Sequence, residues 1–319
     1  MTSSISTWVE QIRGGNLRAL SRAITAVENR TSDSHELLKT LFAHSGRARV
    51  VGLTGAPGAG KSTLVDALAS QYRKRQQTVG IIAIDPTSPF TGGALLGDRI
   101  RMQDHATDGD VFIRSMASRG HLGGVAAATP QVIRALDAAR YDVILIETVG
   151  VGQVEVEIAS LADSVTVLVV PGMGDSIQAA KAGILEIADV FAVNKADRPQ
   201  VQETIRDLRN MIALAARGPD DWKPPIVTTV AITGDGIGEL VGQLDAHRAW
   251  LERSGEGDRR RAARAREEVA ALALGALRRK MARLPGDSAL GALAGRVAEG
   301  QIDPYSAADE LLGALTDSA

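Results

Sequence analysis

The first residues whose types and spacing could do chemistry lie in a glycine-rich stretch near the N-terminal third of the chain. Residues 50–63 read VVGLTGAPGAGKST, which matches the spacing G-x4-G-K-[ST] between an apolar run and a helical stretch. Glycines let the backbone turn its N–H groups toward phosphate oxygens, and the following helix N-terminus adds partial positive charge. The stretch therefore predicts a phosphate loop. Its predicted nucleotide-binding residues are Gly55, Ala56, Pro57, Gly58, Ala59, Gly60, Lys61, Ser62 and Thr63.

Two side chains of this loop carry the expected chemistry. Lys61 is expected to reach the β- and γ-phosphates and to support catalysis, and the Ser62 hydroxyl is expected to bind Mg²⁺. The competing interpretation, an ordinary glycine-rich turn, does not account for the strand-loop-helix context.

A second motif predicts which base is bound. Residues 190–197 read VFAVNKAD, so Asn194, Lys195 and Asp197 follow an apolar run with the N-K-x-D spacing of GTPases. A carboxylate at Asp197 can accept hydrogen bonds from N1–H and the 2-amino group of guanine, whereas adenine would leave it unpaired. A later turn, 230–237, is expected to close over the base through the backbone of Val230, Ala231 and Ile232.

Acidic residues between these motifs are candidates for the metal. Asp85 and Glu147 end predicted strands, and Asp98 follows a glycine-rich segment. Carboxylates bind Mg²⁺ or its waters. Glu147 opens the tetrapeptide ETVG, whose Gly150 N–H is expected to contact the γ-phosphate, so Glu147 and Gly150 are also predicted catalytic groups. Any one of these acids could instead cap a helix or face solvent.

The elements that must position these residues follow from hydrophobic periodicity. Several short runs are apolar without alternation, which is typical of strands buried on both faces of a parallel sheet. Because they alternate with helical stretches, we expect an α/β fold of the P-loop NTPase type, with a mostly parallel sheet flanked by helices. The predicted strands are 49–54, 78–84, 111–114, 142–147, 164–170, 189–193 and 226–231.

Helical patterns on both sides of this core predict two arms. We expect an N-terminal helical arm over 1–46, a nucleotide-binding domain over 47–254, and a C-terminal helical arm over 255–319. The basic cluster that begins at Arg259 is interpreted as a solvated helix face.

Composition excludes several other classes. The chain has 319 residues, 33 glycines, no cysteine, 3% aromatic residues and a formal net charge of −2. Disulfide scaffolds and cysteine nucleophiles are excluded, and neither the charge nor the aromatic content favours nucleic acid. No run approaches the length of a membrane span and no signal core is present, so a cytoplasmic protein is expected.

Together, these motifs resemble the MeaB/ArgK-type G proteins, the GTPase chaperones of methylmalonyl-CoA mutase. The segment DPTSPFTGGALLGDRIRM is far more specific for this family than the phosphate loop. The resemblance covers most of the chain and is carried by 17–29, 54–64, 84–102, 147–155, 170–197 and 222–227.

The resemblance implies a GTPase core of the signal-recognition and MinD-like class that binds GTP, GDP and Mg²⁺. It also implies a homodimer formed through the helical extensions, and docking on an adenosylcobalamin-dependent mutase. It assigns Asp85, Asp98 and Glu147 to the metal shell, and Arg101 and Lys181 to switch segments. Gln153 is a further switch candidate for orienting water, although its offset from Gly150 differs from that in Ras-like GTPases.

The chain departs from the family at Val230, where many relatives have serine, and in the lack of aromatics over 258–283. Three alternatives remain open. A P-loop kinase or transport-linked ATPase would need an acceptor site. A MinD-like ATPase usually carries a lysine where this chain has Ala56. A nickel or cobalt metallochaperone GTPase usually carries Cys/His tracts.

Overall fold

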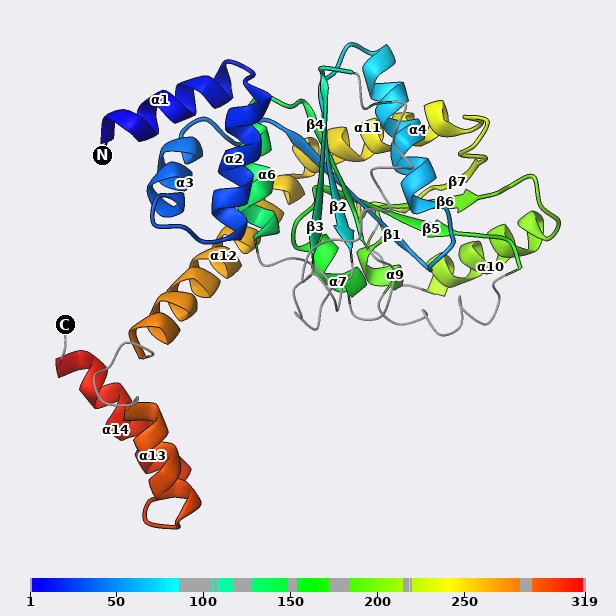
Figure 1. The fold of residues 1–319 in the computed structure, drawn as a ribbon. Helices are drawn as coiled ribbons and strands as arrows, with labels where there is room; N and C mark the ends of the chain where they lie inside the picture. The colour runs from blue at the N-terminus through cyan, green and yellow to red at the C-terminus, as the bar shows by residue number, and fades with distance from the viewer. Residues whose placement is uncertain are drawn as a thin grey trace. The chain divides into compact units, whose positions relative to one another are not determined.

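The computed structural model describes residues 2–85, 105, 108–117, 128–148, 154–172, 184–214, 218, 220–281 and 289–317. The chain divides into two compact units, Met1–Gly257 and Asp258–Ala319. The first unit contains a central sheet covered by helices, and the second is helical (Figure 1).

The sheet has seven strands, in the order β3-β2-β4-β1-β5-β6-β7, and every pairing among them is parallel. The prediction of an α/β fold with a mostly parallel sheet is therefore confirmed. The strands are β1 (Arg49–Gly55), β2 (Val79–Asp85), β3 (Val111–Ala117), β4 (Val143–Glu147), β5 (Ser164–Val169), β6 (Val190–Asn194) and β7 (Ile226–Thr229).

Consecutive strand residues pack into opposite cores, which explains the continuous apolar runs. In β4, Ile144 belongs to the core on one face of the sheet and Leu145 to the core on the other, and both are fully buried. Val50 and Val51 divide in the same way in β1. Burial on both faces requires a helical layer on each side, as Figure 1 shows.

One layer consists of α4 (Lys61–Lys74) and α11 (Ile237–Ser254), whose apolar residues share one core with the strands. The other face is covered by the following helices: α2 (Leu17–Glu28), α6 (Thr129–Ala138), α7 (Val154–Ala159) and α10 (Val201–Leu214). The short helix α9 (Ile184–Ile187) precedes β6. Both faces of the sheet are therefore covered by helices, which leaves the loops at the strand ends as the places where a site can form.

Aspartates that precede the strands close the hydrogen-bond ladders at the N-terminal edge of the sheet. The Asp163 carboxylate accepts from Val50 N at 3.0 Å, and the Asp189 carboxylate accepts from Val165 N at 2.8 Å. Each acceptor precedes the strand that neighbours its donor. These two carboxylates use backbone donors at the N-terminal edge, whereas ligands of open parallel sheets bind at the C-terminal edge.

An N-terminal helical bundle packs on the outer side of α6. It comprises α1 (Thr2–Arg13), α2 and α3 (Ser34–Phe42). Asp137, in the last turn of α6, accepts hydrogen bonds from the backbone N–H groups of Gly46, Arg47 and Ala48, which join the bundle to β1. Arg114 of β3 forms an ion pair with Glu28 of α2.

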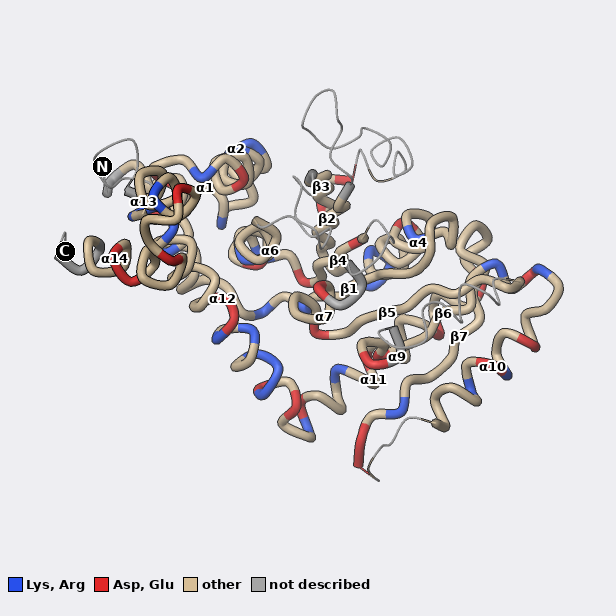
Figure 2. The backbone as a smooth tube through the Cα atoms, turned by 90° about the horizontal axis from the view of Figure 1, so that it is seen from below, with Lys and Arg blue, Asp and Glu red and all other residues tan. Residues whose placement is uncertain are grey.

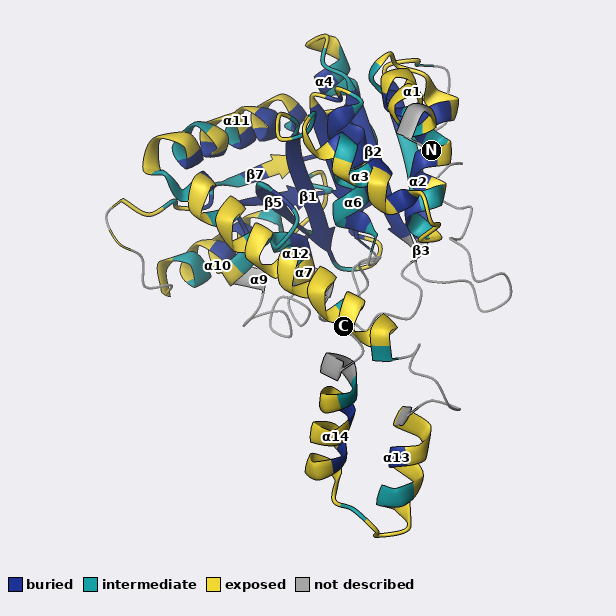
Figure 3. Cartoon of the chain, turned by 90° about the vertical axis from the view of Figure 1, so that its left-hand side faces the viewer, coloured by how far each residue is buried: buried dark blue, intermediate teal, exposed yellow. Residues whose placement is uncertain are grey.

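The second unit contains most of α12 (Glu256–Met281), together with α13 (Ala289–Ala298) and α14 (Pro304–Asp317). A small core of Leu293, Ala307 and Leu311 joins α13 to α14. Lysines and arginines are frequent along α12 (Figure 2). Most of α12 is exposed (Figure 3), including apolar side chains at Val269, Leu272, Leu274 and Leu277. None of the helices in the described part of the chain has the length and apolarity needed to span a bilayer.

Candidate nucleotide-binding site

The phosphate loop connects the end of β1 to the start of α4, in the middle of the sheet. Two of its glycines are required by close contacts as well as by backbone conformation. Gly55 has φ +145°, and a Cβ there would lie 2.4 Å from the Leu168 carbonyl oxygen. Gly60 has φ +92°, and a Cβ there would lie 2.5 Å from Asn194 Nδ2. The neighbouring strand and the guanine motif therefore exclude a side chain at both positions.

Lys61 lies folded over this loop. Its Nζ donates to the carbonyl oxygens of Gly55 at 2.8 Å and Ala56 at 3.1 Å, and the residue is only 7% exposed. A buried ammonium group is costly unless it is hydrogen-bonded, and charge-assisted bonds to an anion are stronger than bonds to carbonyls. Lys61 is thus a desolvated cation at the position where the motif predicts phosphate.

Ser62 and Glu147 form the polar centre beside the loop. The Ser62 hydroxyl donates to Glu147 Oε1 at 2.6 Å, and both residues are buried. β4 lies between β1 and β2, and its last residue, Glu147, is in register with Leu53 on one side and Ala83 on the other. Hydroxyl and carboxylate oxygens are ligands that Mg²⁺ prefers, so this pair fits the predicted metal.

The remaining predicted metal and switch residues lie outside the described residues. These are Asp98, Arg101, Gly150, Gln153 and Lys181; for Asp85 the structure describes the backbone at the end of β2 but not the side chain. The described ranges contain no group of three or more His, Cys, Asp or Glu side chains that could hold a metal ion.

Asn194 joins the guanine motif to two other loops. Its Nδ2 donates to the Ala59 carbonyl at 2.9 Å, and its Oδ1 accepts from Ala231 N at 3.1 Å and from Thr229 Oγ1 at 3.2 Å. Asn194 is almost fully buried. The sequence predicts Asn194 as a base contact, and the structure shows in addition that it connects the phosphate loop to the 230–237 turn.

Lys195 reinforces this connection from the next position. Its backbone has φ +57°, a left-handed conformation that is uncommon outside glycine, and its Nζ donates to Gly58 O at 2.8 Å. Asp197 lies two residues further on and is exposed. The structure therefore brings the phosphate loop, the guanine motif and the last turn together at one edge of the sheet.

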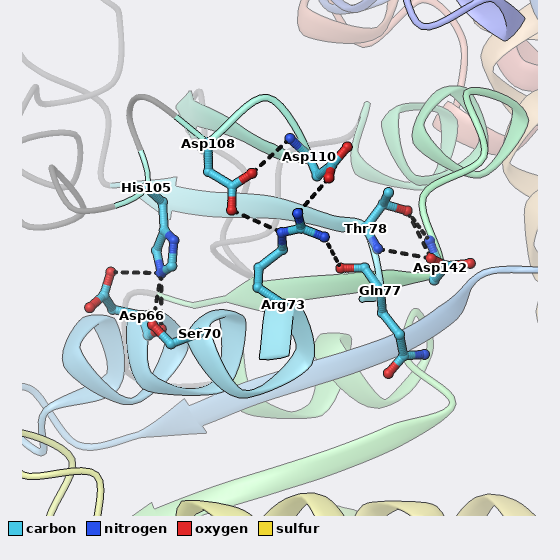
Figure 4. Close-up of polar contacts among 9 residues, drawn as sticks. All are labelled: Asp66, Ser70, Arg73, Gln77, Thr78, His105, Asp108, Asp110 and Asp142. Atoms are coloured by element: carbon cyan, nitrogen blue, oxygen red, sulfur yellow. Dashed lines mark hydrogen bonds and ion pairs between the residues drawn. The ribbon is translucent and has the colours of Figure 1, made fainter. Parts of the chain in front are cut away.

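A polar network on the outer side of α4 anchors the chain that enters β3 (Figure 4). Arg73 donates to Asp108 Oδ2 at 2.9 Å, to Asp110 Oδ2 at 2.5 Å and to the Gln77 carbonyl at 2.9 Å. The pKa of the Asp108 carboxyl is lowered, mainly by the hydrogen bond from Arg73.

His105 belongs to the same network. Its Nε2 lies 3.2 Å from Ser70 Oγ, 3.2 Å from the Asp66 carbonyl and 3.4 Å from Asp66 Oδ1. His105 is buried, and α4 satisfies it locally. The network therefore fixes the chain one to three helical turns along α4 from Ser62.

A Ser-His-Asp arrangement also occurs, at the opposite edge of the sheet. His247 Nδ1 lies 2.8 Å from Ser164 Oγ, and His247 Nε2 lies 3.2 Å from Asp189 Oδ1. Ser164 and His247 have no solvent exposure, and the rings of Trp222 and Trp250 pack on His247. Because no substrate can reach a fully buried hydroxyl, this arrangement is structural.

Sequence reasoning missed the hydroxyl groups that support the site. Thr229 supports Asn194, and Thr148 Oγ1 lies 3.1 Å from Thr54 Oγ1 between β4 and β1. Thr54 and Thr229 are buried near the ends of their strands, and Thr148 is buried directly after β4. For Thr54 and Thr229 the available signal was a threonine near the end of an apolar strand, directly before a motif, whereas Thr148 lies within the ETVG tetrapeptide.

The fold and this site define a P-loop nucleotide-binding protein. The family model described as methylmalonyl-CoA mutase-associated GTPase MeaB matches residues 20–285. The chain belongs to this MeaB family of GTPases, which confirms the resemblance stated from the sequence motifs.

Individual relatives agree with this assignment. A Pyrococcus abyssi protein that carries a GTPase name is 48% identical over 310 residues, with 97% of this chain and 96% of the relative covered. The mouse methylmalonic aciduria type A homolog, a mitochondrial protein, is 33% identical over 259 residues, covering 76% of this chain and 62% of the relative. A solved structure described as LAO/AO transport system kinase superposes with a TM-score of 0.71, at 25% identity, and 98% of each chain is covered.

Proposed function

We propose that this chain hydrolyses GTP in a Mg²⁺-dependent reaction and acts as a chaperone that assembles or protects an adenosylcobalamin-dependent mutase. The observation that carries the GTPase part is the buried Asn194, which joins the phosphate loop to the guanine motif and to the last turn. The family description and the name of the mouse relative support a methylmalonyl-CoA mutase as the client.

In the proposed reaction, water attacks the γ-phosphorus in line with the bond to the β–γ bridging oxygen. That bond breaks, and GDP and inorganic phosphate leave. Lys61 moves from its loop carbonyls to the β- and γ-phosphate oxygens, and the loop N–H groups hold the nucleotide in place. Bound Mg²⁺, held by Ser62 and the Glu147 carboxylate or its waters, would neutralise charge that develops on the phosphates.

We expect the chain alone to hydrolyse GTP slowly. The phosphate loop itself, residues 55–63, contains no arginine, and an arginine at the γ-phosphate is worth a large factor in rate in other GTPases. A mutase partner is expected to raise the rate.

A homodimer through α12 is part of the proposal. Val269 is 67% exposed and Leu272 is 50% exposed, one helical turn apart. Apolar side chains at this spacing on a helix are typical of a surface that is covered in an assembly. Val269→Glu together with Leu272→Glu should convert a dimer to a monomer in light scattering.

The decisive experiment measures phosphate release from GTP and ATP, with and without the mutase. We expect GTP to be preferred, Mg²⁺ to be required, and the mutase to accelerate release at least tenfold. Fast hydrolysis that the mutase leaves unchanged would count against the chaperone function. Transfer of the γ-phosphate to an amino acid or a protein, with ATP preferred, would instead support the kinase function in the name of the solved structure.

A further inference from the structure

Two buried threonine hydroxyls join the C-terminal ends of β1 and β4. Thr148 Oγ1 donates to Thr54 Oγ1 at 3.1 Å and lies 3.4 Å from the Leu53 carbonyl oxygen. Thr54 has no solvent exposure, and Thr148 is 1% exposed. A hydroxyl carries a single proton, so Thr148 donates to the nearer of the two oxygens and Thr54 accepts. Water cannot replace this hydrogen bond at so buried a position.

The hydroxyl pair lies directly beside two parts of the candidate site. Thr54 precedes Gly55, the first glycine of the phosphate loop, and Thr148 follows Glu147. The Glu147 carboxylate accepts from the Ser62 hydroxyl of α4 at 2.6 Å, whereas the next residue along the chain points its hydroxyl at β1. The last residue of β4 is therefore followed at once by a side-chain contact to the strand that carries the phosphate loop.

The position of Glu147 depends on how firmly this strand end is held. Glu147 is the last residue of β4 and is in register with Leu53 of β1. Beyond it, the backbone adds one bond to β1, from Thr148 N to Leu53 O at 3.2 Å, and the hydroxyl pair adds a second link. Groups that bind a metal have to be held within about 0.5 Å of their working positions. Loss of the Thr148 hydroxyl would weaken the link and leave the buried Thr54 hydroxyl without this donor.

We propose that Thr54 and Thr148 are positioning residues for the metal site. Their hydroxyl pair holds the end of β4 against β1, so that the Glu147 carboxylate stays beside the Ser62 hydroxyl, and it thereby sets the affinity of the nucleotide complex for Mg²⁺. The inference rests on the proposed function, because it needs Mg²⁺ at Ser62 and Glu147. Neither threonine is a metal ligand in this assignment, and both act through Glu147.

Two substitutions at Thr148 test the inference by metal affinity. Thr148→Val replaces the hydroxyl by a methyl group of similar size, whereas Thr148→Ser keeps the hydroxyl. Mg²⁺ is titrated into the full-length chain bound to GDP that carries an N-methylanthraniloyl fluorophore. Thr148→Val should raise the Kd for Mg²⁺ by about tenfold, which is typical for the loss of a group that orients a metal ligand, and Thr148→Ser should stay within about twofold of wild type. An unchanged Kd in Thr148→Val would overturn the inference.

Nucleotide affinity without metal separates positioning from a general effect on the fold. In EDTA, Thr148→Val should bind the labelled GDP within about twofold of wild type, because the phosphate loop and the guanine motif are intact. If instead GDP affinity falls as much in EDTA as in Mg²⁺, then the hydroxyl pair supports the whole nucleotide site and the assignment to the metal is wrong.

A second threonine variant and a matched control complete the test. Thr54→Val removes the other half of the pair and should weaken Mg²⁺ binding as Thr148→Val does, and the double variant should lose no more than either single one. Independent, additive losses would contradict a role as a pair. Thr166→Val is the control: Thr166 lies on β5, the other neighbour of β1, has no solvent exposure, and its hydroxyl has no hydrogen-bond partner in the described part of the chain. It should keep the wild-type Mg²⁺ affinity.

The two proposals fail in different ways. If the wild-type GDP complex does not bind Mg²⁺, then the proposed metal site fails, and the assignment of the threonine pair fails with it. If the wild type binds Mg²⁺ and Glu147→Gln loses it, while Thr148→Val and Thr54→Val both keep it, then only the assignment of the threonine pair is wrong.

Discussion

At the scale of single residues, the site is defined by charges that the surrounding loops hold in place. Lys61 is a buried cation that donates to two loop carbonyls, and Asp197 is an exposed carboxylate in the predicted guanine motif. Because we assign Lys61 to the phosphates and Asp197 to the base, substitutions at these two positions should affect hydrolysis and base selection separately.

Lys61→Ala should abolish GTP hydrolysis, because it removes the cation that would neutralise developing phosphate charge. A fall in rate of about a thousandfold is expected for the loss of such a group. Phosphate release under saturating GTP is the measurement. Lys74→Ala, at the exposed far end of the same helix, is the matched control and should keep the wild-type rate.

Asp197→Asn should relax the preference for GTP over ATP by about tenfold or more, because an amide can present a donor to adenine N1 where the carboxylate cannot. Competition between GDP and ADP for the site measures the preference. Asp207→Asn on the exposed side of α10 is the control. A preference that survives in Asp197→Asn would mean that Asp197 does not read the base.

At the scale of elements, two aspartates fix segments that flank the site. Asp137 attaches the linker before β1 to α6 through three backbone N–H groups. Asp108 attaches the start of β3 to α4 through Arg73. Each contact joins elements that are far apart in sequence, so each contributes to the stability of the whole first unit.

Asp137→Ala should destabilise the folded chain by about 2 kcal/mol, because it leaves three partly buried backbone N–H groups without their shared acceptor. Asp137→Asn keeps one acceptor oxygen and should cost about half as much. Urea unfolding at constant m-value measures both. Asp207→Ala should change stability little; an effect of Asp137→Ala no larger than that would show that the linker is not held by this carboxylate.

Arg73→Gln should lower stability at pH 7 by up to about 1 kcal/mol, and the difference from wild type should disappear in acid. The hydrogen bond from Arg73 holds the pKa of Asp108 below its ordinary value. Its contribution is therefore present above the pKa of the unfolded carboxyl, about 3.9, and is lost as pH falls through the lower folded pKa. Thermal unfolding of both proteins between pH 7 and pH 3 measures this; a difference that grows in acid would contradict it.

At the scale of the whole molecule, the described site lies within the first unit, and the exposed apolar positions of α12 lie in the second. The proposed nucleotide binding and the proposed self-association are therefore assigned to different units. The domain limits predicted from the sequence assign nucleotide binding to 47–254 and dimerisation to 255–319. These assignments remain a prediction.

A chain of residues 1–257 should bind GDP within about threefold of the full-length affinity, because it contains every described residue of the site. It should also lose the proposed dimer. Calorimetry measures the affinity, and light scattering compares the mass with twice 33.5 kDa for the full-length chain. A truncated chain that still dimerises would place the dimer interface on the first unit.

Much of this molecule follows from local sequence. Apolar runs such as Val143–Ile146 predict strands buried on both faces, and the structure confirms seven parallel strands. The phosphate loop and the N-K-x-D motif are predictable because their chemistry depends on residues adjacent in the chain. A glycine at positive φ, a lysine and a helix N-terminus meet within a few residues, and no distant contact is needed to bring them together.

The tertiary structure alone decided what each motif residue contacts. Asn194 is a base contact in the sequence motif, but its amide is also bound to Ala59, 135 residues earlier, and to Ala231. From the sequence, Val230, Ala231 and Ile232 are equivalent candidates to close over the base. The fold distinguishes them, because hydrogen bonding is saturable and a donor that serves a distant residue cannot also serve a ligand. Whether an N–H of this turn is already used depends on contacts between residues far apart in the chain, such as Ala231 and Asn194. These contacts exist only once the sheet has assembled.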